Sequence, residues 1–184
     1  MASDYTTVTK RALDTYDGIV AAIGATASAS MNALFPSSAT NSLSAQLKMV
    51  ARMIEQQATF GMKRQVFMVG MGGFDLHDFL ATQHPPLLQK LSSTMKEFDD
   101  AMTSLGKGSQ VTAFTASDFG RTLTSNGDGS DHGWGSHHFV MGGAVNGGKF
   151  LGTAPEIGLT HNQQVGSGRL LPSTAVDQLG AELA

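Results

Sequence analysis

The sequence predicts an α/β fold in which a largely parallel sheet is flanked by helices, and three observations predict it. Short apolar runs at residues 65–69, 111–114 and 139–141 are typical of buried strands. Stretches with apolar residues at steps of three and four precede the first run and separate it from the second. Because a strand, a helix and a strand in succession favour a right-handed crossover, the first two strands are expected to be parallel.

Length and composition narrow the class of protein. The 184 residues suit a single domain, 1–184, with a helix and linker over 1–41 and an α/β core over 42–184. A formal net charge of -3 argues against nucleic acid or an anionic membrane surface as a partner. No apolar run approaches the roughly 20 residues needed to span a bilayer. The chain has no cysteine, which excludes disulfides and thiolate metal sites.

Helices are predicted on both sides of the first strand. The first covers residues 4–30, the second 42–60, and the third follows Pro85 and Pro86. Proline is tolerated in the first turn of a helix, so these two prolines are expected to open the third one. A last helix is predicted to begin near Ser173.

A polar, glycine-rich loop over residues 115–138 joins the second and third predicted strands. It is expected at the carboxyl end of a strand, where ligands bind in open α/β sheets. Carboxylate and imidazole groups from adjacent strand ends suit a divalent metal. The candidate metal ligands follow the first strand or lie in this loop: Asp75, His77, Asp118, Asp131 and His132.

The same loop holds candidates for contact with a substrate: Arg121, Trp134, His137 and His138. Arg121 suits a phosphate- or sulfate-like anion, and an ion pair with Asp118 or Asp131 is the alternative. The two adjacent histidines would point to opposite faces of a strand, so one of them is expected to face the site. The tryptophan would either line a pocket or cover the loop.

No side chain stands out as a nucleophile. Hydroxyl groups occur near the cluster, but the sequence contains no Gly-x-Ser-x-Gly nucleophile elbow and no phosphate-binding P-loop. The hydroxyl residues concerned are Ser117, Thr122, Ser125 and Ser130. The catalytic residue is therefore left unassigned.

Several blocks of sequence resemble the bacterial domain-of-unknown-function 1501 family, which is grouped with alkaline phosphatase-like and sulfatase-like metalloenzymes. The resemblance covers about residues 43–184 and corresponds to the C-terminal part of a family member. The blocks that carry it are Arg64–Phe67, Gly72–His77, Phe114–Thr122, Asn126–Gly135 and Arg169–Gln178.

This resemblance implies metal-dependent hydrolysis of a small anionic phosphate or sulfate ester, with Zn, Ca, Mg or Mn as the metal. Asp118 resembles the aspartate of the superfamily's Asp-His metal pair, and Phe119 stands where the histidine would be. His132 resembles a late metal-binding histidine, and Asp75 with His77 resembles an earlier pair. Family members often carry a twin-arginine export signal, which implies a periplasmic or secreted location.

The family's first strand, with its acidic glycine-rich motif, is not recognisable in this sequence. The chain is therefore expected to form an incomplete alkaline phosphatase-like fold that is inactive alone. An exported binding or assembly module that kept the fold without the chemistry is the alternative. An incomplete sheet would expose an edge, so a homo-oligomer is expected.

Overall fold

The computed structural model describes residues 2–24 and 29–183. The first of two compact units is helical, and all the short strands belong to the second. The protein is thus a mixed α/β protein in which helix predominates. The first unit consists of Met1–Met71 and Lys90–Gly106, and the second of Gly72–Gln89 and Lys107–Ala184.

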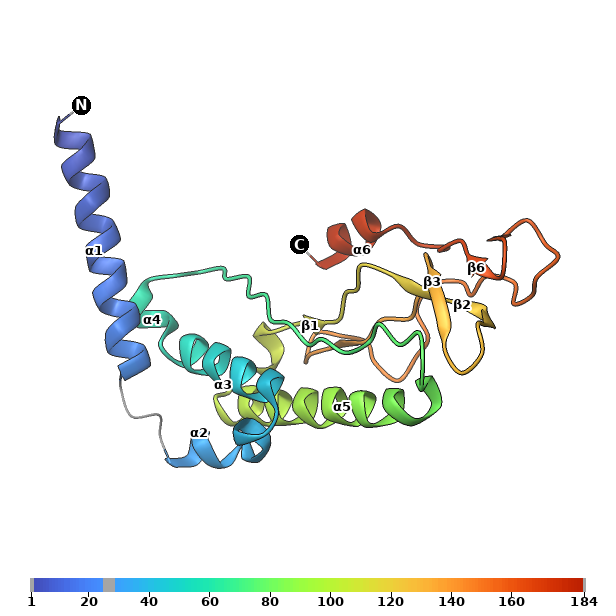
Figure 1. Cartoon of the computed structure of the whole chain (residues 1–184). Coiled ribbons are helices and arrows are strands. Elements are labelled where there is room, and N and C mark those ends of the chain that lie inside the picture. Colours follow the sequence, from blue (N-terminus) through green and yellow to red (C-terminus); the bar gives the residue numbers. More distant parts are fainter. Residues whose placement is uncertain (1, 25–28, 184) are drawn as a thin grey trace. The chain divides into compact units, whose positions relative to one another are not determined.

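The predicted helices are present in the first unit (Figure 1). The helix expected over 4–30 is confirmed up to Gly24, while residues 25–28 lie outside the described residues. The helix expected over 42–60 is confirmed as two helices that meet at Gln56. The bounds are α1 Ala2–Gly24, α2 Ala29–Ala33, η1 Pro36–Ala39, α3 Ser42–Glu55 and α4 Gln57–Phe60.

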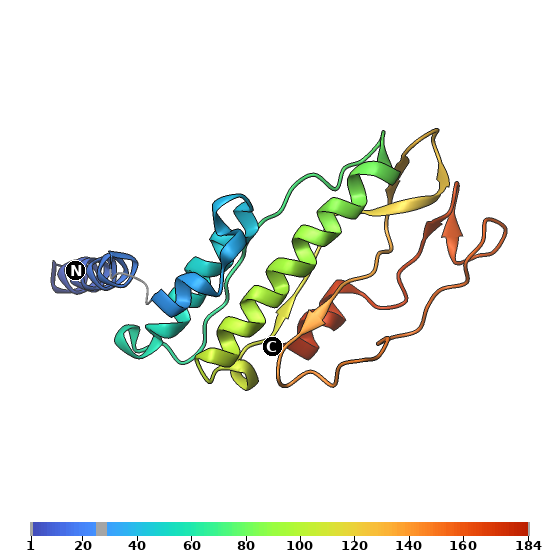
Figure 2. The same cartoon turned by 90° about the horizontal axis from the view of Figure 1, so that it is seen from below.

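Helix α5 (Leu80–Ser104) is a continuous helix in both views (Figure 1, Figure 2), and its sequence contributes to both units. The prediction that the two prolines open this helix is wrong, because Pro85 and Pro86 lie inside it. Proline offers no N–H to the carbonyl four residues earlier. The carbonyls concerned belong to Ala81 and Thr82, which are exposed, so water can take the place of the missing donors.

A buried polar network connects the start of α3 with α5 inside the first unit. The Asn41 side chain caps α3 and donates a hydrogen bond of 2.7 Å to Thr94 Oγ1. The Glu97 carboxylate accepts from the Ser44 hydroxyl at 2.5 Å and from the Ser37 backbone N–H at 3.1 Å. The buried apolar side chains of the same unit are Met31, Phe35, Leu43, Val50, Ala51, Ile54, Phe98, Ala101 and Met102.

The prediction of a largely parallel sheet is wrong. Within the described residues, the strands form three separate two-stranded antiparallel sheets. The run 65–69 is not a strand, and its Val66 and Met68 side chains are 97% and 98% exposed. The pairs are β1 (Ala113–Phe114) with β4 (Val140–Met141), β2 (Gly120–Ser125) with β3 (Ser130–Gly133), and β5 (Gln164–Val165) with β6 (Arg169–Leu170).

The segment expected to be an irregular loop contains the hairpin formed by β2 and β3. Arg121 pairs with His132 and Ser125 with Ser130 in this hairpin. Its turn has the sequence Asn126-Gly-Asp-Gly129, and Asn-Gly and Asp-Gly are strong hairpin signals. The hairpin places Arg121 and His132 opposite each other, and a third candidate site residue, Asp131, beside His132 on β3.

Few apolar side chains are buried in the second unit. Leu76, at 6% exposure, is the buried large apolar side chain that the structure describes there. The other buried positions are small or polar: Gly120, Thr122, Gly129, Ser130, Gly133 and Gly168. Close backbone approach and polar contacts, rather than a large apolar core, therefore hold this unit together.

The remaining elements of the second unit are short. They are η2 (Gly108–Gln110) and α6 (Val176–Leu183), and the latter confirms the helix expected near Ser173. In the described ranges, every helix lacks the length or the apolar character that crossing a bilayer requires.

Candidate metal centre

The segment that carries Asp75 and His77 docks on the turn of the β2–β3 hairpin. The backbone N–H of Leu80 donates to the Asp128 carbonyl at 3.0 Å, and that of Ser130 donates to the Leu76 carbonyl at 3.4 Å. Figure 2 shows the start of α5, in green, beside this yellow hairpin. A Cβ atom at Gly129 would overlap the backbone of His77, so only glycine permits the approach.

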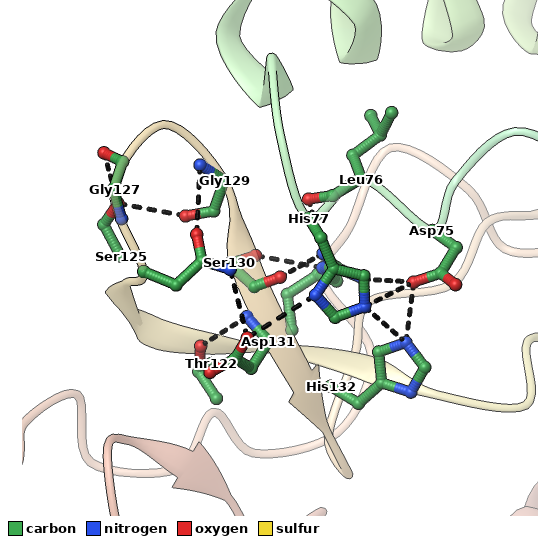
Figure 3. Close-up of polar contacts among 12 residues, drawn as sticks. Asp75, Leu76, His77, Thr122, Ser125, Gly127, Gly129, Ser130, Asp131 and His132 are labelled. Atoms are coloured by element: carbon green, nitrogen blue, oxygen red, sulfur yellow. Dashed lines mark hydrogen bonds and ion pairs between the residues drawn. The ribbon is translucent and has the colours of Figure 1, made fainter.

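Three potential ligand atoms converge where the segment meets the hairpin (Figure 3). Asp75 Oδ1 lies 2.6 Å from His132 Nε2 and 3.0 Å from His77 Nε2. The two Nε2 atoms lie 3.3 Å apart. Asp75, His77 and His132 thus form an exposed group that could hold a metal ion.

The separations within this group match those between ligands of one metal ion. Zn–N and Zn–O bonds of about 2.0–2.1 Å place tetrahedral ligands about 3.3 Å apart and adjacent octahedral ligands about 2.9 Å apart. The observed distances of 2.6, 3.0 and 3.3 Å lie around these values. The three side chains can therefore share one ion after small adjustments.

The other ring nitrogen of His77 faces a second carboxylate. His77 Nδ1 lies 3.5 Å from Asp131 Oδ1, the side opposite to Asp75 (Figure 3). Asn126 Nδ2 donates to the same Asp131 oxygen at 3.1 Å. A carboxylate in this position favours a proton on Nδ1, which leaves Nε2 free to bind a metal.

The ring of His132 is oriented by stacking. Phe119 packs parallel to it, with ring centroids 4.2 Å apart and planes inclined by 2°. The guanidinium of Arg121 lies over the Phe119 ring, at 5.6 Å from its centroid. Arg121 also contacts Asp75 Oδ1 through Nη1 at 3.2 Å.

The pKa of Asp75 is held below its ordinary value of 3.8 by its surroundings. The hydrogen bond with His132 is the main cause, desolvation opposes it, and the hydrogen bond from Arg121 lowers the pKa further. Positive charge on either neighbouring imidazole, of His132 or of His77, acts in the same direction. The surroundings of Asp75 thus favour its ionised carboxylate, the form that can bind a cation.

The other predicted site residues lie outside the three-residue group. Asp118 is exposed and does not join the metal-capable group of the described chain. His138 Nδ1 lies 3.3 Å from Thr115 Oγ1, and partial burial followed by the charge of His137 lowers the pKa of His138 below 6.5. Trp134 is 57% exposed.

Phe119 was noted in the sequence only as a departure from a metal-binding pattern, and its stacking role was missed. It stands one residue before β2, so its place beside His132 follows from the hairpin pairing of Arg121 with His132. The turn signal at Asn126-Gly127 could have indicated that hairpin.

A comparison with known protein families identifies a match. The family described as "Protein of unknown function (DUF1501)" matches residues 14–184, a longer stretch than the residues 43–184 in which the sequence blocks were recognised. No curated protein matches the chain, and no solved structure does. Since the match includes the metal-capable group and nearly all of both units, the chain belongs to the DUF1501 family.

Proposed function

We propose that the chain binds one divalent transition metal through Asp75, His77 and His132 and uses it to hydrolyse a phosphate or sulfate ester. This proposal departs from the expectation that the chain is inactive alone, because the chain itself supplies three convergent potential ligands. The observation that supports this proposal is the convergence of three ligand atoms, from two separate segments, to distances of 2.6–3.3 Å. Two imidazoles and one carboxylate favour Zn or Mn over Mg or Ca, which prefer oxygen ligands.

The number of ligands and their exposure favour a catalytic site over a structural one. Structural zinc sites are closed by four protein ligands, whereas catalytic sites keep a position open. The side chains of Asp75, His77 and His132 are 57%, 46% and 49% exposed, so a substrate can reach them. A bound cation would polarise an ester oxygen and lower the pKa of a coordinated water.

Water is the proposed nucleophile, because the hydroxyl groups near the site have other contacts. The Ser117 and Thr122 hydroxyls donate to nearby backbone carbonyls, at 2.9 and 2.8 Å. The Ser125 hydroxyl donates within its own turn, and Ser130 Oγ accepts from Arg121 Nε. In this proposal the chain's own residues hold the metal and orient the imidazoles.

The second candidate function is a metal-binding module without catalysis, which serves binding or assembly. It is favoured by the contacts of Arg121, whose three nitrogens all bond to protein groups instead of pointing toward a substrate. The occupied hydroxyls favour it as well. The two candidates differ in turnover and agree on the metal.

The test uses the full chain after its metal has been removed with a chelator. Titration calorimetry with Zn²⁺ and Mn²⁺ measures metal binding. The rate of cleavage of aryl phosphates and aryl sulfates measures hydrolysis. The His132→Asn variant is expected to lose both metal binding and turnover. His161→Asn is the matched control, because His161 lies in the same unit and its hydrogen bonds within the described chain are to nearby backbone groups at 3.1 Å.

Each outcome has a distinct meaning. Metal-dependent turnover that is lost in His132→Asn and kept in His161→Asn supports the hydrolase. Stoichiometric metal binding without turnover of either ester class supports the non-catalytic module. Zn²⁺ and Mn²⁺ binding that is equal in both variants would show that the ligand set is wrong.

A further inference from the structure

The guanidinium of Arg121 ties the two segments of the metal centre together. Nε donates to Ser130 Oγ at 2.9 Å, and Nη2 donates to the carbonyls of Leu76, at 2.5 Å, and of Ser130. Nη1 donates to Asp75 Oδ1 at 3.2 Å. One side chain on β2 therefore bonds to the Asp75 segment and to β3.

The same guanidinium also supports His132, the proposed ligand on β3. It lies over the ring of Phe119, and that ring in turn stacks on the imidazole of His132. Arg121 therefore contacts one ligand directly and another through a single intervening ring. Loss of the guanidinium would release both of them from their present orientation.

We propose that Arg121 is the positioning residue of the metal centre, holding Asp75 and His132 at coordinating distance, and that it does not bind the substrate anion. This inference rests on the proposed function of the site. Its chemical basis is the planar guanidinium, which presents five N–H donors in a fixed fork. A lysine has the same charge but cannot bond to several fixed acceptors in one plane.

The contacts of Arg121 argue against the alternative that it binds an anion. Its four hydrogen bonds to Asp75, Leu76 and Ser130 use four of the five donors. The side chain is only 22% exposed. The one remaining donor is on Nη1, which already bonds to Asp75, so an incoming phosphate or sulfate would meet a single N–H beside the carboxylate of a proposed ligand.

The experiment compares Arg121→Lys with the unsubstituted full chain, using Co²⁺ as the probe after chelator treatment. The variant is expected to bind Co²⁺ about 10–100-fold more weakly, as when an outer-shell partner is lost. The visible absorption of bound Co²⁺ should also change, because it reports ligand geometry, which a general loss of stability would not alter.

Arg169→Lys is the matched control. Arg169 lies in the same unit and donates to the His132 and Gly166 carbonyls at 3.2 and 3.0 Å, without a bond to a ligand side chain. Its Co²⁺ affinity and spectrum are expected to stay unchanged. If Arg121→Lys keeps the original affinity and spectrum but binds inorganic phosphate more weakly, Arg121 is an anion-binding residue and the inference is overturned.

A measurement on the unsubstituted chain covers the case in which Arg121→Lys does not fold. The ¹⁵N resonance of Arg121 Nε is expected to shift when Zn²⁺ is added and to remain in place when inorganic phosphate follows. The reverse pattern would overturn the inference. Failure of the unsubstituted chain to bind either Co²⁺ or Zn²⁺ would overturn the proposed function itself, and the role of Arg121 with it.

Discussion

Replacement of Gly129 by alanine tests whether the Asp75 segment docks on the hairpin turn. The new Cβ atom would lie 2.8 Å from the backbone nitrogen of Asp78, and the His77 carbonyl would be closer still. Ordinary Cβ contacts begin at 3.4 Å, so the two segments must separate by more than the 0.6 Å between 2.8 and 3.4 Å. Overpacking of this kind destabilises a protein by about 1–3 kcal/mol.

A displacement of that size would also affect the proposed metal centre. Metal–ligand distances tolerate deviations of only about 0.2 Å. His77 would move with its carbonyl, away from His132 on the other segment. We therefore expect Gly129→Ala to lower Zn²⁺ affinity about 10–100-fold, comparable to the loss of an outer-shell partner.

Chelator competition measures the affinity, and urea unfolding measures the stability. Gly72→Ala is the matched control, because a Cβ there would meet nothing within 4 Å and Gly72 precedes Asp75 on the same segment. If Gly129→Ala matches Gly72→Ala in both measurements, the close approach of the segment to the turn is refuted.

Three further predictions concern single carboxylates. Asp131→Asn should weaken Zn²⁺ binding about 10–100-fold, measured by calorimetry, because it removes the partner of His77 Nδ1; unchanged affinity would exclude an orienting role. Glu97→Ala should lower the free energy of unfolding in urea by about 2–5 kcal/mol, since it leaves the buried Ser44 hydroxyl and the partly buried Ser37 backbone N–H without an acceptor. Glu97→Gln should lower the free energy of unfolding by less than Glu97→Ala does, and equal decreases in the two variants would contradict this account. The lowered pKa of Asp75 means that the folded state favours its carboxylate, so this stabilisation is present above pH 3.8 and disappears as the pH falls through the folded-state pKa. The melting temperatures of the unsubstituted chain and Asp75→Asn should therefore differ at pH 6 and converge in acid, and a constant difference would contradict the pairing.

Local sequence patterns predicted the helices well. In α3 the apolar positions recur at steps of three and four, and Leu43, Val50 and Ile54 are indeed buried. A helix satisfies its hydrogen bonds within one stretch of chain, so the pattern along that stretch carries the information. The start of α5 was missed because the prolines stand where exposed carbonyls can be hydrated.

The sheet could not be predicted in the same way. Strand pairing joins distant residues, and neither partner nor direction is encoded in a short apolar run. Residues 65–69 have strand-like composition but no strand partner in the described chain. The sequence predicts Asp75, His77 and His132 as candidate ligands, but their convergence depends on how the Asp75 segment docks on the β2–β3 hairpin.

The parallel stack of Phe119 on His132 gives the molecule an internal spectroscopic reporter. The circulating π electrons of the phenylalanine shield protons directly above its ring, so the carbon-bound protons of the His132 imidazole should resonate upfield of those of the other histidines. Any event that tilts the imidazole would move these lines. The state of the centre can thus be followed by proton resonance without an added label.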